Sequence, residues 1–198
     1  ETCSGDTLME PGMEMSKIGS TGRPLPHVEI EIRDGLGKTL PPNTIGEICI
    51  RGPKVTCGYW KAPEKTQCSF YGDWLRSGDV GYLDEDGFLF LTDRSKDMIL
   101  TGAENVASLE VENIIYMLPQ VAEAAVVGVP DTQWGERVTA VVALIEGGSL
   151  TFAELESHCR QYLAGFKVPK DMRIVEHLPR NPSGKVLKRV IRESLANE

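Results

Sequence analysis

The sequence predicts an α+β protein: a small antiparallel β unit followed by a compact α+β domain with a central sheet and flanking helices. In the first half, apolar and polar residues alternate at a period of two, which is typical of half-buried strands. Beyond Arg94 the pattern changes to helical stripes and Val-rich apolar runs, so we expect a domain boundary near residues 93–97. A chain of 198 residues is long enough for one or two domains with real cores.

The strands of the β unit are predicted from alternating segments. Residues 1–26 lack periodicity and are expected to form irregular connections. In HVEIEIRD (residues 27–34) three aliphatic residues alternate with polar ones, and GEICIRG (residues 46–52) repeats the pattern. Residues 79–94 hold two short apolar segments around an Asp-Glu-Asp-Gly turn, which predicts a hairpin.

Two helices are predicted within the second unit. Residues 109–118 carry an i, i+3, i+4, i+7 apolar stripe, with Ser108 as a suitable N-cap. Thr151 and Glu154 form a capping box ahead of the second helix, and Gly165 is its expected stop. The residues that this second helix is expected to bury are Phe152, Leu155, Cys159 and Tyr162.

The remaining elements of the second unit complete a sheet and a final helix. Residues 121–129 and 137–146 are nearly continuous apolar runs, as expected for buried central strands. Residues 172–178 form the last predicted strand and residues 186–198 the last helix. This unit has about a hundred residues, a common domain size.

Composition excludes several classes of protein. The net charge of -8 argues against a nucleic-acid partner, and no apolar run approaches the length of about 20 residues that spans a bilayer. The five cysteines are scattered and never in C-x-x-C spacing, which argues against a disulfide framework or a zinc site. The three histidines have no partner at ligand spacing. A protein of the reducing cytoplasm, with no transmembrane segment, is expected.

The charge is nevertheless uneven along the chain. Residues 165–192 contain eight Lys or Arg and two acidic residues, so they carry +6 while the remainder carries -14. One interpretation is a solvated face with a basic helix, and the other is a local site for an anionic ligand. The sequence leaves both open.

Three polar, Gly-rich stretches are candidates for chemistry. They are residues 74–87 with Asp79, residues 92–106, and residues 181–189 with the pair Gly184-Lys185. Taken singly, each is explained by a turn or a charged linker. A nucleotide-binding P-loop is excluded for the third, because Pro179 stands where the first Gly should be and Val186 where a hydroxyl should bind magnesium.

Taken together, these stretches resemble the acyl-adenylate-forming enzymes, which include AMP-forming acyl-CoA synthetases, peptide-synthetase adenylation domains and firefly luciferase. Residues 46–60 (GEICIRGPKVTCGYW) are similar to the family's GE-x-x-x-RG-P-x-x-x-x-GYW segment, and RSGDVG (residues 76–81) to its TGD segment. Residues 91–106 (LTDRSKDMILTGAENV) resemble the hinge segment. Residues 178–189 (LPRNPSGKVLKR) resemble the terminal lysine motif, so the resemblance runs over essentially the whole chain.

The resemblance implies roles for individual residues. Lys185 matches the catalytic lysine of the small C-terminal domain, whose ammonium stabilises the charge that develops on the α-phosphate during adenylation. Asp79 matches the acid that accepts hydrogen bonds from the ribose hydroxyls, and Arg94 the basic residue that holds the ribose and phosphate region. Lys96 falls at the hinge about which the C-terminal domain swings between half-reactions.

The same resemblance implies a channel and a weaker metal ligand. Gly102, Ala103 and Glu104 match the loop that lines the pantetheine channel, where small residues allow close backbone approach. Glu1 could end the family's YG-x-TE motif, whose Glu helps bind Mg²⁺. Departures from the commonest pattern are Asp93, Ser95 and Ala103, the last of which narrows the channel.

The resemblance therefore implies part of an ATP-dependent carboxylic acid–CoA ligase of fatty-acid or aryl-acid type, with ATP, Mg²⁺ and CoA as cofactors and substrates. Residues 1–93 would end the large adenylate-forming domain, residues 94–97 would be the hinge, and residues 98–198 the mobile C-terminal domain. The partners implied are a small carboxylic acid, ATP, CoA and the missing N-terminal part of the same chain, without which this piece is expected to be inactive. Alternatives are a noncatalytic nucleotide- or partner-binding module and a fatty acyl-AMP ligase.

Overall fold

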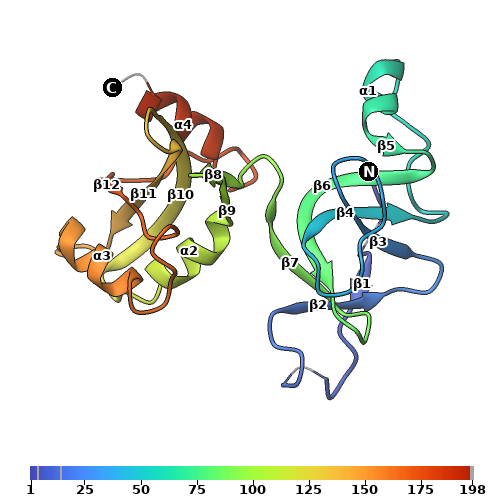
Figure 1. The fold of residues 1–198 in the computed structure, drawn as a ribbon, viewed down its shortest axis with the longest axis horizontal. Coiled ribbons are helices and arrows are strands. Elements are labelled where there is room, and N and C mark those ends of the chain that lie inside the picture. The colour runs from blue at the N-terminus through green and yellow to red at the C-terminus, as the bar shows by residue number, and fades with distance from the viewer. Residues whose placement is uncertain (4, 14, 197–198) are drawn as a thin grey trace. The chain divides into compact units, whose positions relative to one another are not determined.

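The computed structural model describes residues 1–3, 5–13 and 15–196, and it confirms the predicted α+β class. The chain divides into two compact units, Glu1–Lys96 and Asp97–Glu198. Each unit is built on its own sheet (Figure 1).

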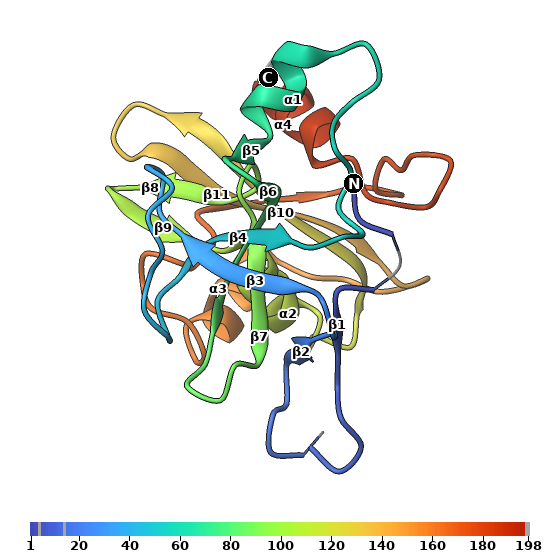
Figure 2. The same ribbon diagram turned by 90° about the vertical axis from the view of Figure 1, so that its right-hand side faces the viewer.

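The first unit is a seven-stranded antiparallel sheet with the order β1-β2-β7-β6-β4-β3, in which β5 also pairs with β6. Figures 1 and 2 both show the short helix α1 and β5 beyond one end of this sheet. The elements are β1 (Thr7–Leu8), β2 (Ser20–Pro24), β3 (Glu29–Arg33), β4 (Gly46–Arg51), α1 (Pro63–Cys68), β5 (Phe70–Tyr71), β6 (Trp74–Leu83) and β7 (Leu89–Arg94).

The alternation in the sequence fixes the register of β3 and β4. Ile30 lies opposite Ile50 and Ile32 opposite Ile48, and all four are buried in one cluster. Cross-strand aliphatic pairs of this kind stabilise a sheet and resist slippage, because a shift of one residue would expose the whole set. The prediction that residues 1–26 are irregular is wrong in part, since β1 and β2 form there by pairing with each other and with β7.

The second unit has a five-stranded sheet. Four of its strands follow the order β10-β11-β8-β9, and the fifth, β12, pairs in parallel with β11. Figure 1 shows α2 and α3 on one side of this sheet and α4 on the other. The elements are β8 (Ile99–Thr101), β9 (Glu104–Val106), α2 (Ser108–Ile115), β10 (Val121–Asp131), β11 (Gly135–Leu144), α3 (Phe152–Cys159), β12 (Asp171–Ile174) and α4 (Lys188–Ala196).

Two separate cores explain the nearly continuous apolar runs of β10 and β11. On β10, Ala124 and Val126 pack with α2 and α3, whereas Ala125 and Val127 pack with Ile191 of α4. Successive side chains of a strand point to opposite faces, so a strand covered on both sides is apolar at every position. Both strands are therefore buried on their two faces, as predicted, but β10 lies at the edge of the sheet and only β11 is central.

The start of the helix agrees with the sequence at α3 and differs at α2. The capping box of α3 is present, with Thr151 Oγ1 accepting from Glu154 N at 3.3 Å and Glu154 Oε2 accepting from Thr151 N at 2.7 Å. The N-cap prediction for Ser108 is wrong: α2 begins at Ser108 with Ala107 as the N-cap. The Ser108 hydroxyl instead binds Lys188, a contact that no local pattern predicts.

The end of α3 also differs from expectation. The helix ends at Cys159, with Arg160 as the C-cap, well before Gly165. Tyr162 is exposed and Leu163 is buried in its place, because the turn after the helix shifts the apolar face by one residue. In the described part of the chain, no helix has both the length and the apolar character needed to cross a bilayer.

Burial divides the cysteines into two chemical groups. Cys49 and Cys159 are buried, and desolvation of the thiolate raises the pKa of each thiol to about 11. Cys3, Cys57 and Cys68 are exposed. At about pH 8 we expect a disulfide thiol reagent to modify the three exposed thiols in the native protein, and the other two only at the rate of unfolding. Rapid titration of all five native thiols would contradict the buried cores described above.

Candidate functional site

The first predicted site residues lie on the β6–β7 hairpin. Asp79 and Arg94 are opposite each other in the ladder, and Arg94 Nε donates a hydrogen bond to Asp79 Oδ1 at 2.7 Å. The side chains are 34% exposed for Asp79 and 37% for Arg94, so both remain within reach of a ligand. Residues opposite in an antiparallel pair project to the same face. The register of the hairpin therefore places the carboxylate beside the guanidinium.

The backbone before Asp79 is an irregularity within a strand. β6 continues through residues 77–79, but Gly78 has φ +74° and its carbonyl accepts from Ser95 N at 2.9 Å. Asp79 N donates to Ser77 Oγ at 3.0 Å. The interpretation of Asp79 as a turn residue bonded to its own backbone is wrong, because its carboxylate binds Arg94.

Glu1 lies in the same unit and shares the charged neighbourhood of Arg94. Tyr59 donates a hydrogen bond to Glu1 Oε1 at 2.7 Å. This bond is the main cause that lowers the pKa of the Glu1 carboxyl; the charge of its own amino group comes next, and Lys65 and Arg94 act weakly in the same direction. An ionised carboxylate at this point can contribute one ligand to Mg²⁺, which usually keeps waters and phosphate oxygens in its remaining positions. Among the described residues no group of three or more potential metal-binding side chains occurs.

The predicted channel residues form the tip of the β8–β9 hairpin. Thr101 is paired with Glu104, and the two-residue loop between them has φ +56° at Gly102 and +68° at Ala103. Positive φ at both positions defines a type I′ turn, which normally selects Asn-Gly or Gly-Gly. Gly102 N donates to Trp134 O at 2.8 Å, and a Cβ added at Gly102 would lie 3.2 Å from the Trp134 ring. Gly102 is therefore needed for close approach to Trp134 as well as for the turn.

Lys185 is presented by an ordered turn between Asn181 and Lys185. Asn181 Oδ1 accepts from the backbone amides of Ser183 and Lys185 and from the Ser183 hydroxyl, at 3.1, 2.8 and 2.8 Å. Gly184 has φ +83°, and its amide donates to Asn181 O at 2.9 Å. Asn favours such turns because its side chain replaces a backbone acceptor. Lys185 itself is exposed, and no hydrogen bond or ion pair from its ammonium to another described residue is found.

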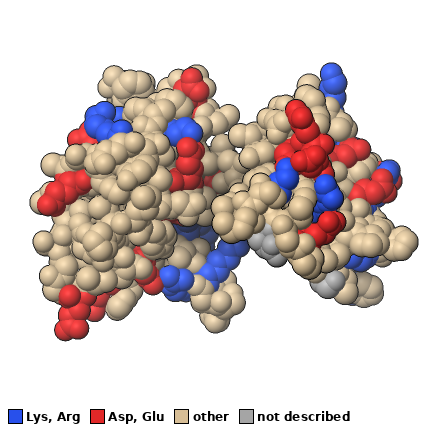
Figure 3. All heavy atoms as spheres, turned by 90° about the horizontal axis from the view of Figure 1, so that it is seen from below, with Lys and Arg blue, Asp and Glu red and all other residues tan. Residues whose placement is uncertain are grey.

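The basic tract, residues 165–192, does not form a continuous anion-binding surface. Six of its eight cations are in ion pairs with acidic side chains of the same unit: Lys167, Arg173, Arg180, Lys188, Arg189 and Arg192. Figure 3 shows basic and acidic side chains interspersed on the face that it presents. The interpretation of residues 165–192 as one site for an anion is therefore not supported, and the positive charge that remains is local.

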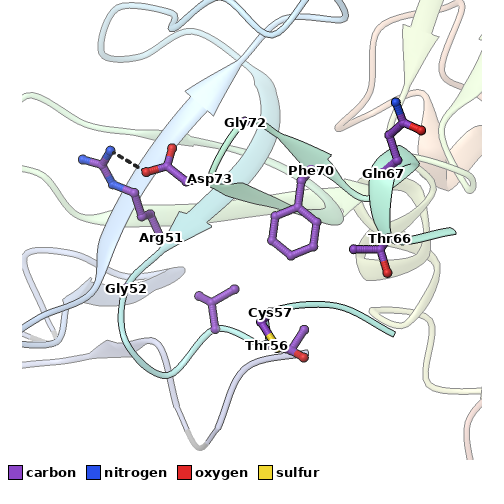
Figure 4. Close-up of a pocket in the computed structure, with 10 residues that line it drawn as sticks. Arg51, Gly52, Thr56, Cys57, Thr66, Gln67, Phe70, Gly72 and Asp73 are labelled. Atoms are coloured by element: carbon purple, nitrogen blue, oxygen red, sulfur yellow. Dashed lines mark hydrogen bonds and ion pairs between the residues drawn. The ribbon is translucent and has the colours of Figure 1, made fainter. Parts of the chain in front are cut away.

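A hollow of about 640 Å³ in the first unit lies apart from these residues (Figure 4). The Phe70 ring extends into it, α1 lines it with Thr66 and Gln67, and the ion pair between Arg51 and Asp73 lies at its other end. None of the predicted site residues lines this hollow. Its charged side chains are already in ion pairs, Arg51 with both Glu29 and Asp73.

Comparison with known proteins supports the resemblance given by the motifs. Residues 1–60 match the family of AMP-binding enzymes, and residues 110–185 match the C-terminal domain of AMP-binding enzymes. The chain is 43% identical over 192 residues to the 2-succinylbenzoate–CoA ligase of Geobacillus kaustophilus, which covers 97% of this chain. The chain belongs to the AMP-binding enzyme family.

Two other members of the AMP-binding family show what fraction of such a protein this chain spans. The fatty acid–[acyl-carrier-protein] ligase ScoC of Streptomyces coeruleorubidus is 42% identical over 90% of this chain. The o-succinylbenzoate CoA synthetase of Bacillus subtilis, solved with the acyl-adenylate intermediate, superimposes with a TM-score of 0.91 at 38% identity over 98% of this chain. The chain spans 39% of the Geobacillus ligase, 34% of ScoC and 39% of the Bacillus structure, and it corresponds to their C-terminal portion.

Three residues that the sequence did not indicate lie beside predicted site residues in the structure. Tyr59 binds Glu1, Trp134 contacts the turn at Gly102, and Arg180 binds the carbonyl of Gly184. Tyr59 and Arg180 lie within the recognised motifs, so the polar side chains of those motifs were the signal that could have indicated them. Trp134 is distant in sequence from the hairpin, and only the fold brings them together.

The strained turn gives a test of the hairpin geometry. Ala103→Gly is expected to raise the free energy of unfolding by about 0.5–1 kcal/mol, because relief of the left-handed conformation exceeds the entropy that Gly gains in the unfolded chain. The same substitution at the exposed helical position Ala153 should lower it by about 1 kcal/mol. Chemical denaturation measures both, and equal losses for the two variants would contradict the turn described here.

Proposed function

We propose that this chain is the C-terminal part of an AMP-forming carboxylic acid–CoA ligase. In the first half-reaction a carboxylate attacks the α-phosphate of ATP and releases pyrophosphate. In the second, the thiolate of CoA displaces AMP from the acyl-adenylate. The family assignment supports the chemistry, and the chain's own residues are proposed to hold the nucleotide, stabilise charge on the phosphate and admit the thiol. A reducing, cytoplasmic location fits the free thiols.

The observation that carries the proposal is the presentation of Lys185. Its backbone is ordered by Asn181, while its ammonium lies on an exposed turn. Charge that spreads over the nonbridging oxygens of the α-phosphate is stabilised best by a donor whose position is set before the reaction. A point charge on a long stem suits this task, because it can follow the phosphorus as its geometry changes.

The nucleotide is proposed to bind at the Asp79–Arg94 pair. A carboxylate can accept hydrogen bonds from two ribose hydroxyls, and the adjacent guanidinium can contact the ribose and phosphate oxygens. Glu1 is proposed as one ligand of Mg²⁺, in keeping with its lowered pKa. The Bacillus synthetase solved with ATP and magnesium ion, 38% identical, supports this combination of ligands.

The second half-reaction is proposed to use the hinge and the β8–β9 hairpin. Lys96 is the last residue of the first unit, which is where a hinge needs backbone freedom. Gly102, Ala103 and Glu104 at the hairpin tip are proposed to line the pantetheine channel. Most cations of residues 165–192 are paired with acidic side chains, so this tract is not proposed as the binding site for the CoA phosphates.

The acid is proposed to be an aryl or fatty acid, in line with the 2-succinylbenzoate and fatty acid ligases that the chain resembles. A second candidate is transfer to a carrier protein, because ScoC, at 42% identity, is named as an acyl-carrier-protein ligase. Incubation of the full-length enzyme with CoA and with a phosphopantetheinylated carrier, followed by mass spectrometry of the thioester, separates the two acceptors.

Lys185→Ala in the full-length enzyme tests the catalytic assignment. We expect pyrophosphate exchange into ATP to fall by about 10²–10³-fold, the usual effect of removing one preorganised donor to a developing charge. Thioester formation from preformed acyl-adenylate and CoA should be largely kept. Lys38→Ala, at an exposed turn of the first unit, is the matched control. Full exchange activity in Lys185→Ala would refute the assignment.

Asp79→Asn tests the nucleotide site. An amide has the shape of the carboxylate but lacks its charge, so a charge-assisted bond to each ribose hydroxyl weakens; we expect the KM for ATP to rise about 10- to 100-fold. Asp73→Asn, which also removes a carboxylate paired with an arginine, should leave the KM unchanged. Equal KM values for the two variants would place the ribose elsewhere.

A further inference from the structure

The turn that carries Lys185 lies between two ion pairs. Arg180 comes just before the turn and Lys188 just after it, and each binds a glutamate on a rigid element of the same unit. The hydrogen bonds of Asn181 fix the internal shape of the turn, but they do not attach it to the rest of the unit. Leu178 and Val186 pack on the apolar cluster between β10, β11 and α4. The charged attachment near Lys185 is made by these two pairs.

The guanidinium of Arg180 bridges the turn and the sheet. Its Nη1 donates to Gly184 O at 2.6 Å, directly before Lys185, and its Nη2 donates to Glu123 Oε1 at 2.8 Å. The other oxygen of Glu123 accepts from Leu178 N at 3.2 Å, so one carboxylate of β10 holds both the start of the motif and its arginine. The hydrogen bond from Arg180 is the main cause that lowers the pKa of Glu123.

Lys188 anchors the other side of the turn. Its Nζ donates to Glu112 Oε1 at 2.6 Å and to Ser108 Oγ at 2.5 Å. The side chains of Lys188 and Glu112 are only 13% and 8% exposed, and Glu112 Oε1 also accepts from Val126 N of β10 at 2.7 Å. Because a buried charge requires its partner, this pair ties the first turn of α4 to α2 and β10.

We propose that Arg180 and Lys188 are positioning residues for the ammonium of Lys185. The inference rests on the proposed function, in which that ammonium stabilises the α-phosphate. The two charged anchors hold the backbone of Lys185 relative to the sheet, so that the flexible side chain starts from a fixed point. An error of about 1 Å in such a group can cost a hundredfold in rate.

The interaction of Arg180 with Glu123 is the better one to test, because it is partly exposed and its loss should leave the unit folded. In the full-length enzyme, Glu123→Gln and Arg180→Met are expected to lower pyrophosphate exchange by about 10- to 100-fold. Thioester formation from preformed acyl-adenylate should stay close to that of the unsubstituted enzyme. The matched control is Glu156→Gln, which removes the partner of Arg160 in an ion pair of 2.6 Å on α3, against 2.8 Å for Arg180 and Glu123, and should change neither rate.

Lys188 gives a second comparison by rescue. Lys188→Arg keeps the charge and should keep most of the exchange activity, whereas Lys188→Met should lose it. Lys188→Met leaves Glu112 buried without its cation. If this variant shows no melting transition, the Arg180 variants decide the matter. A fall of both half-reactions by the same factor would indicate general damage and overturn the positioning role.

Hydrogen exchange of this chain tests the anchoring without reference to activity. Arg180→Met and Glu123→Gln should accelerate exchange of the Gly184 and Lys185 amides about tenfold or more, while amides of the β10–β11 ladder keep their protection. Glu156→Gln should not alter the turn. Unchanged exchange at the turn would overturn the proposal. Retention of pyrophosphate exchange by Lys185→Ala would instead refute the catalytic assignment, and the amide data would still show whether the anchors hold the turn.

Discussion

The second unit depends on one constraint: β10 and β11 form a ten-pair antiparallel ladder that is buried on both faces. One face must be covered by α2 and α3 and the other by α4, so the helices cannot be exchanged or omitted without exposing Val, Ala and Ile side chains. The residues of this unit that are proposed for function are attached to this ladder. The β8–β9 hairpin pairs with β11 at Gly135, and Glu123 of β10 holds the turn of Lys185.

Charge in this protein is organised by pairs rather than by patches. The cations of residues 165–192 neutralise acids of α2, β10 and β12 and also Asp97, and this pairing attaches α4 and the Lys185 turn to the unit. The net charge counted over residues 165–192 alone suggests a positive surface, because the count leaves out the acidic partners elsewhere in the chain. Neutralisation of the surroundings has a functional merit, since an ammonium that acts on one phosphate should not compete with neighbouring cations for it.

Periodicity predicted the strands and helices whose faces are buried locally, such as Ile30 and Ile32 opposite β4 and the capping box at Thr151. It could not predict β1 and β2, whose polar segments become strands only because β7 supplies the partner edge. The site shows the same division. Motif resemblance located Asp79, Arg94 and Lys185, and their chemical roles stay predictions. The contact of Ser108 with Lys188, 80 residues away, required the fold.

Asp97 ties the residue after the proposed hinge to the rest of the second unit. It directly follows Lys96, is nearly buried, and is held by both terminal nitrogens of Arg192 on α4 at 3.1 Å. The residue after the proposed hinge is thus fixed to the same helix whose first turn is anchored by Lys188. Rotation of the backbone at Lys96 would therefore carry the Lys185 turn and the β8–β9 hairpin as parts of one body. This is the mechanical condition that a domain swing between half-reactions requires: freedom at one residue and rigidity directly after it.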